Sequence, residues 1–352
     1  MSVQCVGFVL CSPSSRPLPS SRIAVLNMLP FLSAAGIDTR ILFEPAEPTE
    51  TPDLTGVAER AIEAKCDVVV LQKIRGPGAE ALAHKLAAAG VGTVYCVCDL
   101  VDASMARATD ATTVVTEYLK SLYPTQLQSR IHVVHDGIER PVMEKKEWGN
   151  NTGTWLNPLK AVLVTSATLD HLPFIDQPPR WLKVGIVGRY ARGLRRWQET
   201  RWTLAMQTRD ERFDYLRFLA NRRIECLPWD QEGVYKEMLQ ADLAVIPIDQ
   251  PAAALDSTAS PPWKVKSENR LTMKMSIGLP VIATPIPSYE PVIEHGVNGF
   301  FARSTHDWKA CLTALRDPER RREMGVAARA SVTRKYSMKE QATKLIRVLS
   351  EV

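Results

Sequence analysis

Long apolar segments are missing from this chain of 352 residues. No run approaches the roughly 20 apolar residues that a helix needs to cross a bilayer, which excludes a membrane-spanning protein. The first residues, MSVQCVGFVLCS, have no basic segment before the apolar part and no small-residue cleavage site after it. They predict a first strand rather than a signal peptide. We therefore expect a cytoplasmic protein.

Disulfide and metal-binding patterns are also missing. The seven cysteines are odd in number, include no Cys-x-x-Cys pair, and mostly lie in apolar, strand-like runs. They predict buried, reduced thiols, as in a cytoplasmic protein. The close histidine pair, His132 and His135, would point to opposite faces of a strand. We therefore expect structural histidines and no metal site.

Acidic residues are few in two segments of a chain whose formal net charge is +5. Residues 189–223 hold ten arginines and four acidic residues, and residues 316–335 hold seven basic and three acidic residues. These basic side chains either cover solvated helix faces or attract phosphates or an anionic membrane surface. Zinc-finger spacing and aromatic RNA-binding signatures are missing, so we expect no nucleic-acid partner. Peripheral contact with the inner membrane face remains an open alternative.

A regular alternation of short β-rich runs with helical stretches is what the chain does contain. Apolar runs such as CDVVVLQK (66–73) are typical of parallel strands that helices cover on both faces. Residues 139–156 are polar and rich in turn residues, so they interrupt the alternation as a linker. The pattern predicts two doubly wound α/β domains, residues 1–150 and 151–335, and a final helix within 336–352.

Three expected helices bear on the functional regions. One begins at Arg22 and ends at Gly36, one covers about 195–221, and one covers 288–295. Each doubly wound sheet places its ligand site beyond the carboxyl ends of its strands, so two facing sheets create one cleft. Loops that follow strands are therefore where we expect the chemistry.

Residues 266–302, KSENRLTMKMSIGLPVIATPIPSYEPVIEHGVNGFFA, are the most informative segment. Ser267 is a favourable N-cap for the helix that follows it. The amides at this helix start, together with Lys266 and Arg270, suit a diphosphate. Asn269 adds a side chain that both donates and accepts hydrogen bonds. The opposing interpretation is a charged helix start that binds nothing.

The run GLPVIAT, followed by YEPVIEHGVNGFFA and by a helix that contains Asp307 and Trp308, resembles the donor domain of the retaining glycosyltransferases of family 4. The ending REMGVAARASVTRKYSMKEQATKLIRVL is similar to the same family. The likeness is strong over about 266–348 and looser in the first half, where DATTVVTEYL precedes HVVHDGIERP. It implies the GT-B fold, in which two Rossmann-like α/β domains face a central cleft and a C-terminal helix crosses back to the first domain.

Two family motifs differ in this chain. The arginine and lysine that often follow the first strand of the family's donor domain are missing, since that stretch reads SATLDHLP here. Family members usually carry a Glu-x7-Glu motif, and its two positions are Val265 and Met273 here. A branch of the family instead has Lys-x-x-Asn-Arg/Lys before the helix, which Lys266, Asn269 and Arg270 match. The resemblance implies transfer of a sugar, with retention of its anomeric configuration, from a nucleotide diphosphate sugar to a glycan, a lipid or another hydroxyl acceptor. The missing glutamates keep a second hypothesis open, a catalytically impaired relative that binds nucleotide or glycan or partners an active transferase.

The resemblance and the strand-end positions together suggest roles for individual residues. Cations that hold the leaving diphosphate would contribute most to catalysis. This role falls to Lys266 and to Arg189, unless Arg189 is only a surface arginine. The expected donor-binding residues are Ser267, Asn269, Arg270, Asp249, Thr284, Gly188 and Arg22.

The expected acceptor-side residues are Ser14, Ser15, Asp99 and Asp102. The two aspartates follow a strand, where they would either orient acceptor hydroxyls or cap the next segment. Their spacing does not match the Asp-x-Asp pattern of metal-dependent transferases. Because protein cations would take the place of a metal, we expect no metal and no cofactor.

Overall fold

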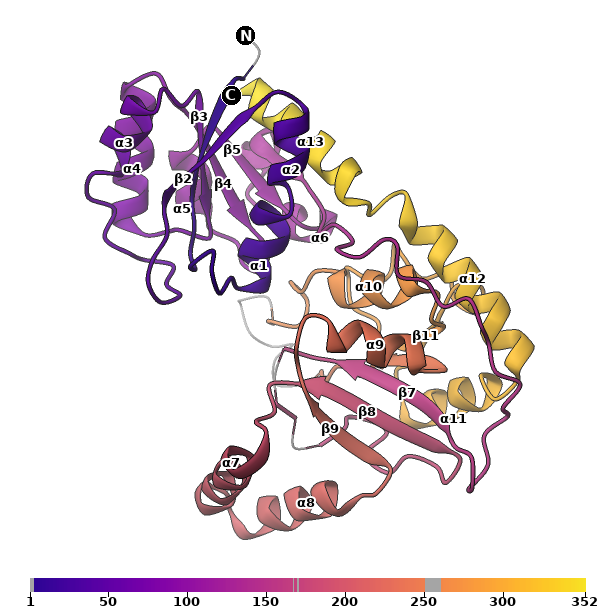
Figure 1. Cartoon of the computed structure of the whole chain (residues 1–352). Helices are drawn as coiled ribbons and strands as arrows, with labels where there is room; N and C mark the ends of the chain where they lie inside the picture. Colours follow the sequence, from indigo (N-terminus) through magenta and orange to yellow (C-terminus); the bar gives the residue numbers. More distant parts are fainter. Residues whose placement is uncertain (1–2, 167, 170, 251–260) are drawn as a thin grey trace. The chain divides into compact units, whose positions relative to one another are not determined.

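Two compact units make up the chain (Figure 1), which a computed structural model describes over residues 3–166, 168–169, 171–250 and 261–352. Unit 1 takes the described residues within 1–139, 258–269 and 334–352, and unit 2 takes those within 140–257 and 270–333. The first boundary thus lies at 139/140 rather than at the expected 150/151. Residues 261–269, expected in the second domain, belong to unit 1 because Val265 is buried in its core.

Unit 1 is built on a parallel six-stranded sheet with the order β2-β1-β3-β4-β5-β6. Its central strands β1 and β3 are buried along their whole length, because helices cover both faces of the sheet. Val6 of one central strand lies beside Val68 of the next. The strands are β1 (Cys5–Val9), β2 (Asp38–Phe43), β3 (Val68–Gln72), β4 (Gly92–Val97), β5 (Ala111–Val114) and β6 (Ile131–Val133).

Helices pack on both faces of this sheet (Figure 1). One face carries α3 (Val57–Glu63), α4 (Pro77–Ala88), α5 (Ala103–Ala108) and α6 (Glu117–Ser121), and a 3₁₀ turn, Thr125–Arg130, precedes β6. The other carries α1 (Pro19–Ser21), its continuation as a π-helical turn Arg22–Leu26, α2 (Leu29–Ala34) and α13 (Met338–Glu351). Leu345 and Leu349 of α13 enter the core on this face. The expected return of the C-terminal helix to the first domain is confirmed.

The helix expected from Arg22 to Gly36 is interrupted. Asn27 donates its backbone amide to the Arg22 carbonyl in a π-helical turn, and α2 starts two residues later. Pro30 stands in the first turn of α2, where its missing amide costs no helical hydrogen bond. A continuous helix would need that amide to pair with the preceding turn, so the proline divides it.

Unit 2 contains a second parallel six-stranded sheet, in the order β12-β11-β10-β7-β8-β9. In its central strand β10 every side chain is buried. The core on one face takes Phe218 and Trp308 from the covering helices. The strands are β7 (Leu159–Val164), β8 (Leu182–Gly188), β9 (Ile224–Pro228), β10 (Leu243–Ile246), β11 (Val281–Ala283) and β12 (Phe300–Phe301).

The helices of unit 2 also lie on both sides of their sheet, with α9 and α10 on one side and α11 on the other (Figure 1). Their bounds are α7 (Gly193–Met206), α8 (Arg209–Ala220), α9 (Gly233–Gln240), α10 (Asn269–Ile277), α11 (Thr305–Ala314) and α12 (Pro318–Thr333). The single helix expected over 195–221 is wrong, because Thr208 caps a separate helix α8 through a capping box with Glu211. The helix expected over 288–295 is also wrong, since this stretch forms turns around Pro291.

The expected linker, 139–156, is tied to α12 by arginines. The buried guanidinium of Arg321 donates to the carbonyl of Asn151 at 2.5 Å. Arg329 donates to the carbonyl of Met143 at 3.2 Å. These arginines thus satisfy backbone oxygens of an irregular segment that has no strand or helix partners of its own. Among the described residues no helix is both long and apolar enough to cross a membrane.

Candidate functional site

The segment that follows β6 brings a buried carboxyl group to the carboxyl edge of the unit 1 sheet. Asp136 is only 8% exposed, and its carboxyl is hydrogen-bonded to the side chain of Ser267. Burial is the main cause that raises the pKa of Asp136 to about 7, and the nearby carboxylates of Glu268 and Glu139 add to it, against the effect of Ser267. This carboxyl is therefore partly protonated near neutral pH.

His135 makes a second buried contact with the segment that contains Ser267, this time through Glu268. Its Nδ1 lies 2.6 Å from an oxygen of Glu268 and 2.9 Å from the carbonyl oxygen of Val115. Both neighbours are acceptors, so Nδ1 is the nitrogen that carries a proton. The ring packs edge-on against Tyr336, and the His135 amide donates to the Gln341 side chain. The base of α13 thus helps to hold the imidazole in place.

These contacts anchor residues 265–268 on unit 1. Val265 enters the apolar core, and the side chains of Ser267 and Glu268 face Asp136 and His135. The helix α10 begins at Asn269, two residues after Ser267, so the expected N-cap role of Ser267 is wrong. The Ser267 side chain is instead hydrogen-bonded to Asp136. Lys266, in contrast, stays exposed.

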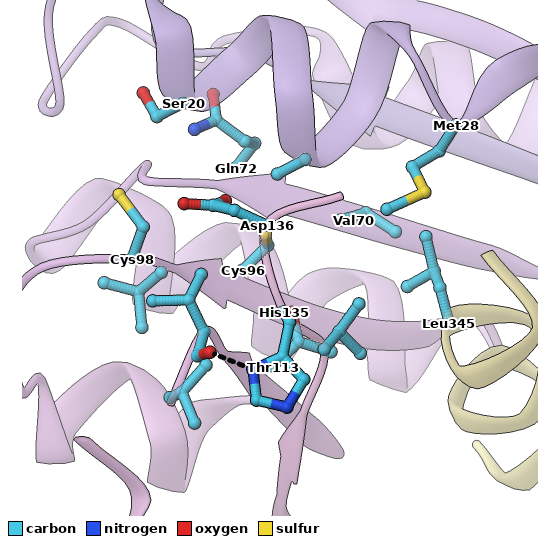
Figure 2. Close-up of a pocket in the computed structure, with 15 residues that line it drawn as sticks. Ser20, Met28, Val70, Gln72, Cys96, Cys98, Thr113, His135, Asp136 and Leu345 are labelled. Atoms are coloured by element: carbon cyan, nitrogen blue, oxygen red, sulfur yellow. Dashed lines mark hydrogen bonds between the residues drawn. The ribbon is translucent and has the colours of Figure 1, made fainter. Parts of the chain in front are cut away.

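A small cavity adjoins this cluster (Figure 2). Gln72, Cys96, Thr113, His135 and Asp136 are among the side chains that line it. Its volume of about 20 Å³ accommodates a single water molecule. A sugar or nucleotide does not fit, so the cavity belongs to the buried environment of Asp136 and is no substrate pocket.

Arg22 is occupied by a buried ion pair. Its guanidinium donates two hydrogen bonds to Glu139, at 2.7 and 3.0 Å, and Asn27 donates a third to the same carboxylate at 2.9 Å. Both charged side chains are largely buried, at 13% and 10% exposure. Arg22 therefore joins the helical layer to Glu139, which follows β6 in the chain. The sequence pattern predicts a donor contact for Arg22 and not this structural role.

The expected acceptor-side residues lie in separate surroundings. Asp102 caps α5 by accepting from the Met105 amide at 3.0 Å, so the capping alternative is confirmed for it. Asp99 forms an ion pair with Lys73 at 2.9 Å. Ser14 donates its amide to Glu44 and Ser15 is exposed. The structure does not bring these four residues into one cluster.

The carboxyl edge of the unit 2 sheet carries the remaining candidates. Arg189 directly follows β8 and its side chain is exposed, whereas Gly188 ends the strand and accepts a backbone bond from Trp229. Thr284 is 1% exposed, and its hydroxyl accepts from the amide of Ile248 at 3.0 Å. The threonine thus stabilises the neighbouring strand ends. Asp249, after β10, is exposed.

The first turn of α10 approaches this same edge. Arg270 donates to the hydroxyl of Ser166 at 2.8 Å, just beyond the end of β7. Asn269 is the first residue of the helix, whose N-terminal amides have no partners within the helix. A guanidinium and a helix N-terminus at a strand edge form an anion-binding arrangement.

Sequence reasoning missed a buried lysine one turn further along. Lys274 is fully buried and donates to the Arg270 carbonyl at 2.8 Å. Burial, together with the charge of Arg270, lowers its pKa to about 7. Lys274 follows Leu271 by three residues and precedes Met275 by one, which places it on the apolar side of the helix. This spacing in the sequence could have predicted its burial.

Metal ligands do not gather in the described part of the chain: no group of three or more histidine, cysteine, aspartate or glutamate side chains is placed to hold an ion there. The buried acid–histidine cluster around Asp136 was likewise missed from sequence. Its signal was the run HVVHDG directly after a strand, where a parallel sheet places its functional loops.

Comparisons with known proteins agree with this architecture. Residues 180–347 match the family model described as glycosyl transferase-like. A glycosyltransferase of Rickettsia africae has a TM-score of 0.72 at 12% identity, over 100% of this chain and 99% of its own. Anabaena HepE, solved with UDP and glucose, has a TM-score of 0.66 at 14% identity, over 99% of this chain and 100% of its own.

A third solved structure, sucrose-phosphate synthase of Thermosynechococcus elongatus, has a TM-score of 0.64 at 12% identity over 99% of this chain and 98% of its own. No curated protein matches the sequence. Likenesses at such low identity show the architecture, so the expected fold class is confirmed. The chain has the GT-B fold, and its residues 180–347 match a glycosyl transferase-like domain.

Proposed function

We propose that this protein is a glycosyltransferase that moves a sugar from a nucleotide diphosphate sugar to a hydroxyl of a glycan or glycolipid. The observation that carries the proposal is the tether of Arg270 to Ser166, which holds a guanidinium beside the start of α10. The matched family model spans this helix. Since HepE was solved with UDP and glucose, uridine diphosphate sugars are the first donors to test.

The proposed mechanism places the diphosphate against the first amides of α10. Negative charge grows on the leaving diphosphate as the sugar–phosphate bond breaks, so cations at this position stabilise the transition state more than the bound donor. Arg270 would form charge-assisted hydrogen bonds to it, and Lys266, three residues before the helix, would add an ammonium group. Retention and independence of metal ions are parts of this proposal, the latter resting on the absence of an Asp-x-Asp pattern.

The test is release of nucleoside diphosphate from a panel of nucleotide sugars, with and without candidate acceptors. Lys266→Ala should lower kcat by roughly 10²–10³-fold with a smaller effect on donor affinity. Lys264→Ala is the matched control, because Lys264 is in the same loop and contacts the Trp263 ring. Equal kinetics of the two variants would contradict the role of Lys266.

Two further arms separate the parts of the proposal. Turnover in EDTA should equal turnover in manganese, and activity that manganese restores after EDTA would contradict metal independence. The second hypothesis, an inactive nucleotide-binding relative, predicts no release with any donor but a higher Tm with UDP. A ligand at 100 times its Kd adds about 2.7 kcal/mol of stability, so such binding is measurable. We also propose that the protein is cytoplasmic and that it binds peripherally to the inner face of the membrane.

A further inference from the structure

Helix α7 contributes nothing to the core of unit 2. None of its 14 residues is buried, although the helix contains four large apolar side chains in exposed positions. These are Leu194 (87% exposed), Trp197 (67%), Trp202 (67%) and Met206 (71%). Figure 1 shows α7 and α8 as consecutive helices at one end of this unit. A helix normally hides such side chains, so this exposure requires another explanation.

Helix α8 also has exposed apolar side chains. It turns Tyr215 and Phe218 towards the core, while Phe213 is 68% exposed and Leu216 is 49% exposed. On α7, Leu194, Trp202 and Met206 are spaced by multiples of four residues and therefore lie along one row of the helix. We call the exposed side chains of these two helices the α7–α8 surface.

Arginines are interspersed with these apolar side chains. Residues 189–223 hold ten arginines and four acidic residues. Within the described ranges Arg201 and Arg209 of these helices have no side-chain partner, and Arg195 has only an exposed contact with Glu199 at 3.4 Å. The surface is thus both cationic and rich in tryptophan.

The other basic segment, 316–335, is different. Arg321 and Arg329 donate to backbone carbonyls of the 139–156 linker, and Arg320 donates to the Gly296 carbonyl. Arg322 pairs with Glu319. Most of its guanidinium groups are therefore used within the unit. Of the two basic segments, only 189–223 combines free arginines with exposed aromatic rings.

We propose that the α7–α8 surface docks on an anionic phospholipid membrane. Tryptophan is favoured at the boundary between headgroups and acyl chains, where an apolar ring meets a polar layer. Arginine is attracted to anionic headgroups, and a helix with both kinds of side chain lies in the plane of the interface. This surface lies on helices outside the proposed donor residues and is independent of the sugar-transfer proposal.

Charge favours a membrane over a second copy of the chain. A symmetric dimer through this surface would place the arginine-rich segments of two copies against each other. Such like-charge contact opposes association, whereas anionic lipid complements it. The occupant is therefore a lipid surface, and self-association is an outcome of the test that would overturn the proposal.

The first experiment is flotation of the full-length protein with vesicles of phosphatidylcholine alone or with about 30 mol% phosphatidylglycerol. We expect binding to the anionic vesicles at low salt and much weaker binding at 1 M salt, where the Debye length is about 3 Å. Binding to both vesicle types alike, or to neither, would overturn the proposal. Concentration-dependent dimerisation without lipid binding would assign the surface to a second copy.

Paired variants then locate the contact. Trp197→Ala/Trp202→Ala should abolish flotation, whereas Trp155→Ala, which changes an exposed tryptophan outside the α7–α8 surface, should leave it unchanged. Melting curves of the wild type and of both variants should coincide, because none of these side chains is in the core. Equal loss in both variants would contradict the assignment.

Charge variants test the electrostatic part. Arg201→Gln/Arg209→Gln should lower the apparent partition coefficient by about 25-fold, on the basis of about fivefold for each arginine near an anionic surface. The matched control is Arg334→Gln/Lys335→Gln in the rival basic segment, with little expected effect. A control variant that loses as much binding would move the contact to 316–335. Nucleoside diphosphate release without vesicles should be unchanged in every variant, so a failed activity assay does not affect this test.

Discussion

Replacing Asp136 by asparagine should make the stability of unit 1 less dependent on pH. The pKa of Asp136 is raised, mainly by burial, to about 7, whereas the pKa of an ordinary aspartate is about 3.9. Between these values the folded protein binds more protons than the unfolded one. The free energy of unfolding therefore falls as pH rises, by about 1.4 kcal/mol per pH unit for one such group.

The difference of about three pKa units corresponds to about 4 kcal/mol, which Asp136 contributes fully below about pH 4 and loses as pH approaches 7. The amide of the substituted side chain would stay neutral and could still hydrogen-bond Ser267. We expect Asp136→Asn to stabilise unit 1 by about 2–4 kcal/mol at pH 8 and to have little effect at pH 4. The variant should also hold residues 265–268 in place over a wider pH range.

The assay is urea unfolding at fixed pH between 5 and 8, followed by a brief thiol-labelling pulse at one pH. Mass spectrometry then separates Cys11, buried in unit 1, from Cys226, buried in unit 2. Only the Cys11 transition should respond to the substitution. The control Asp53→Asn removes an exposed carboxyl whose pKa is lowered by hydrogen bonds from Thr55, so its effect should have the opposite sign. A wild-type Cys11 transition that is flat from pH 5 to 8 would refute the reasoning.

Three further substitutions test contacts within each unit, and equilibrium unfolding measures their effect on stability. Lys274→Met should stabilise unit 2 by about 5 kcal/mol below pH 7 and converge with wild type towards pH 10. The reason is that burial lowers the lysine pKa to about 7, so the wild-type folded state gains stability as pH rises. No gain at pH 6 would contradict this. Gly325→Ala should destabilise unit 2 by about 1–3 kcal/mol, since a methyl group there would collide with the Gly278 carbonyl oxygen and the Trp148 ring. An unchanged Tm would show that these neighbours move to accommodate the methyl group. Glu139→Gln should cost about 3 kcal/mol, because it removes the charge that faces the buried Arg22 guanidinium, whereas Glu47→Gln, in an exposed pair, should cost less than about 1 kcal/mol.

Local pattern was sufficient for most of the fold. Runs such as VVVLQ (68–72) predicted buried parallel strands, and the amphipathic final segment predicted the helix that packs on unit 1. The expectations that failed were those where a local break competes with helical periodicity. Thr208 with Glu211 starts a new helix, and Pro30 divides an apparent single one.

The site was predictable only in part. The helix start with Arg270 and the strand-end position of Arg189 followed from sequence order, because parallel strands place their following loops at one edge. The partner of Arg22 did not, since Glu139 is more than 100 residues away in the chain. Pairing between such distant side chains depends on how the layers pack, which no local pattern contains.

The sequence by itself determined two parallel sheets, their helical cover and the segment that approaches the edge of the second sheet. Hydrophobic periodicity and turn chemistry act over a few residues and are therefore readable along the chain. Only the tertiary structure decided that Ser267 bonds Asp136, that Lys274 is buried, and that α7 leaves Trp197 and Trp202 exposed. Burial and charge pairing depend on neighbours brought together by the fold, and these set the pKa values and the free surface from which the functional proposals follow.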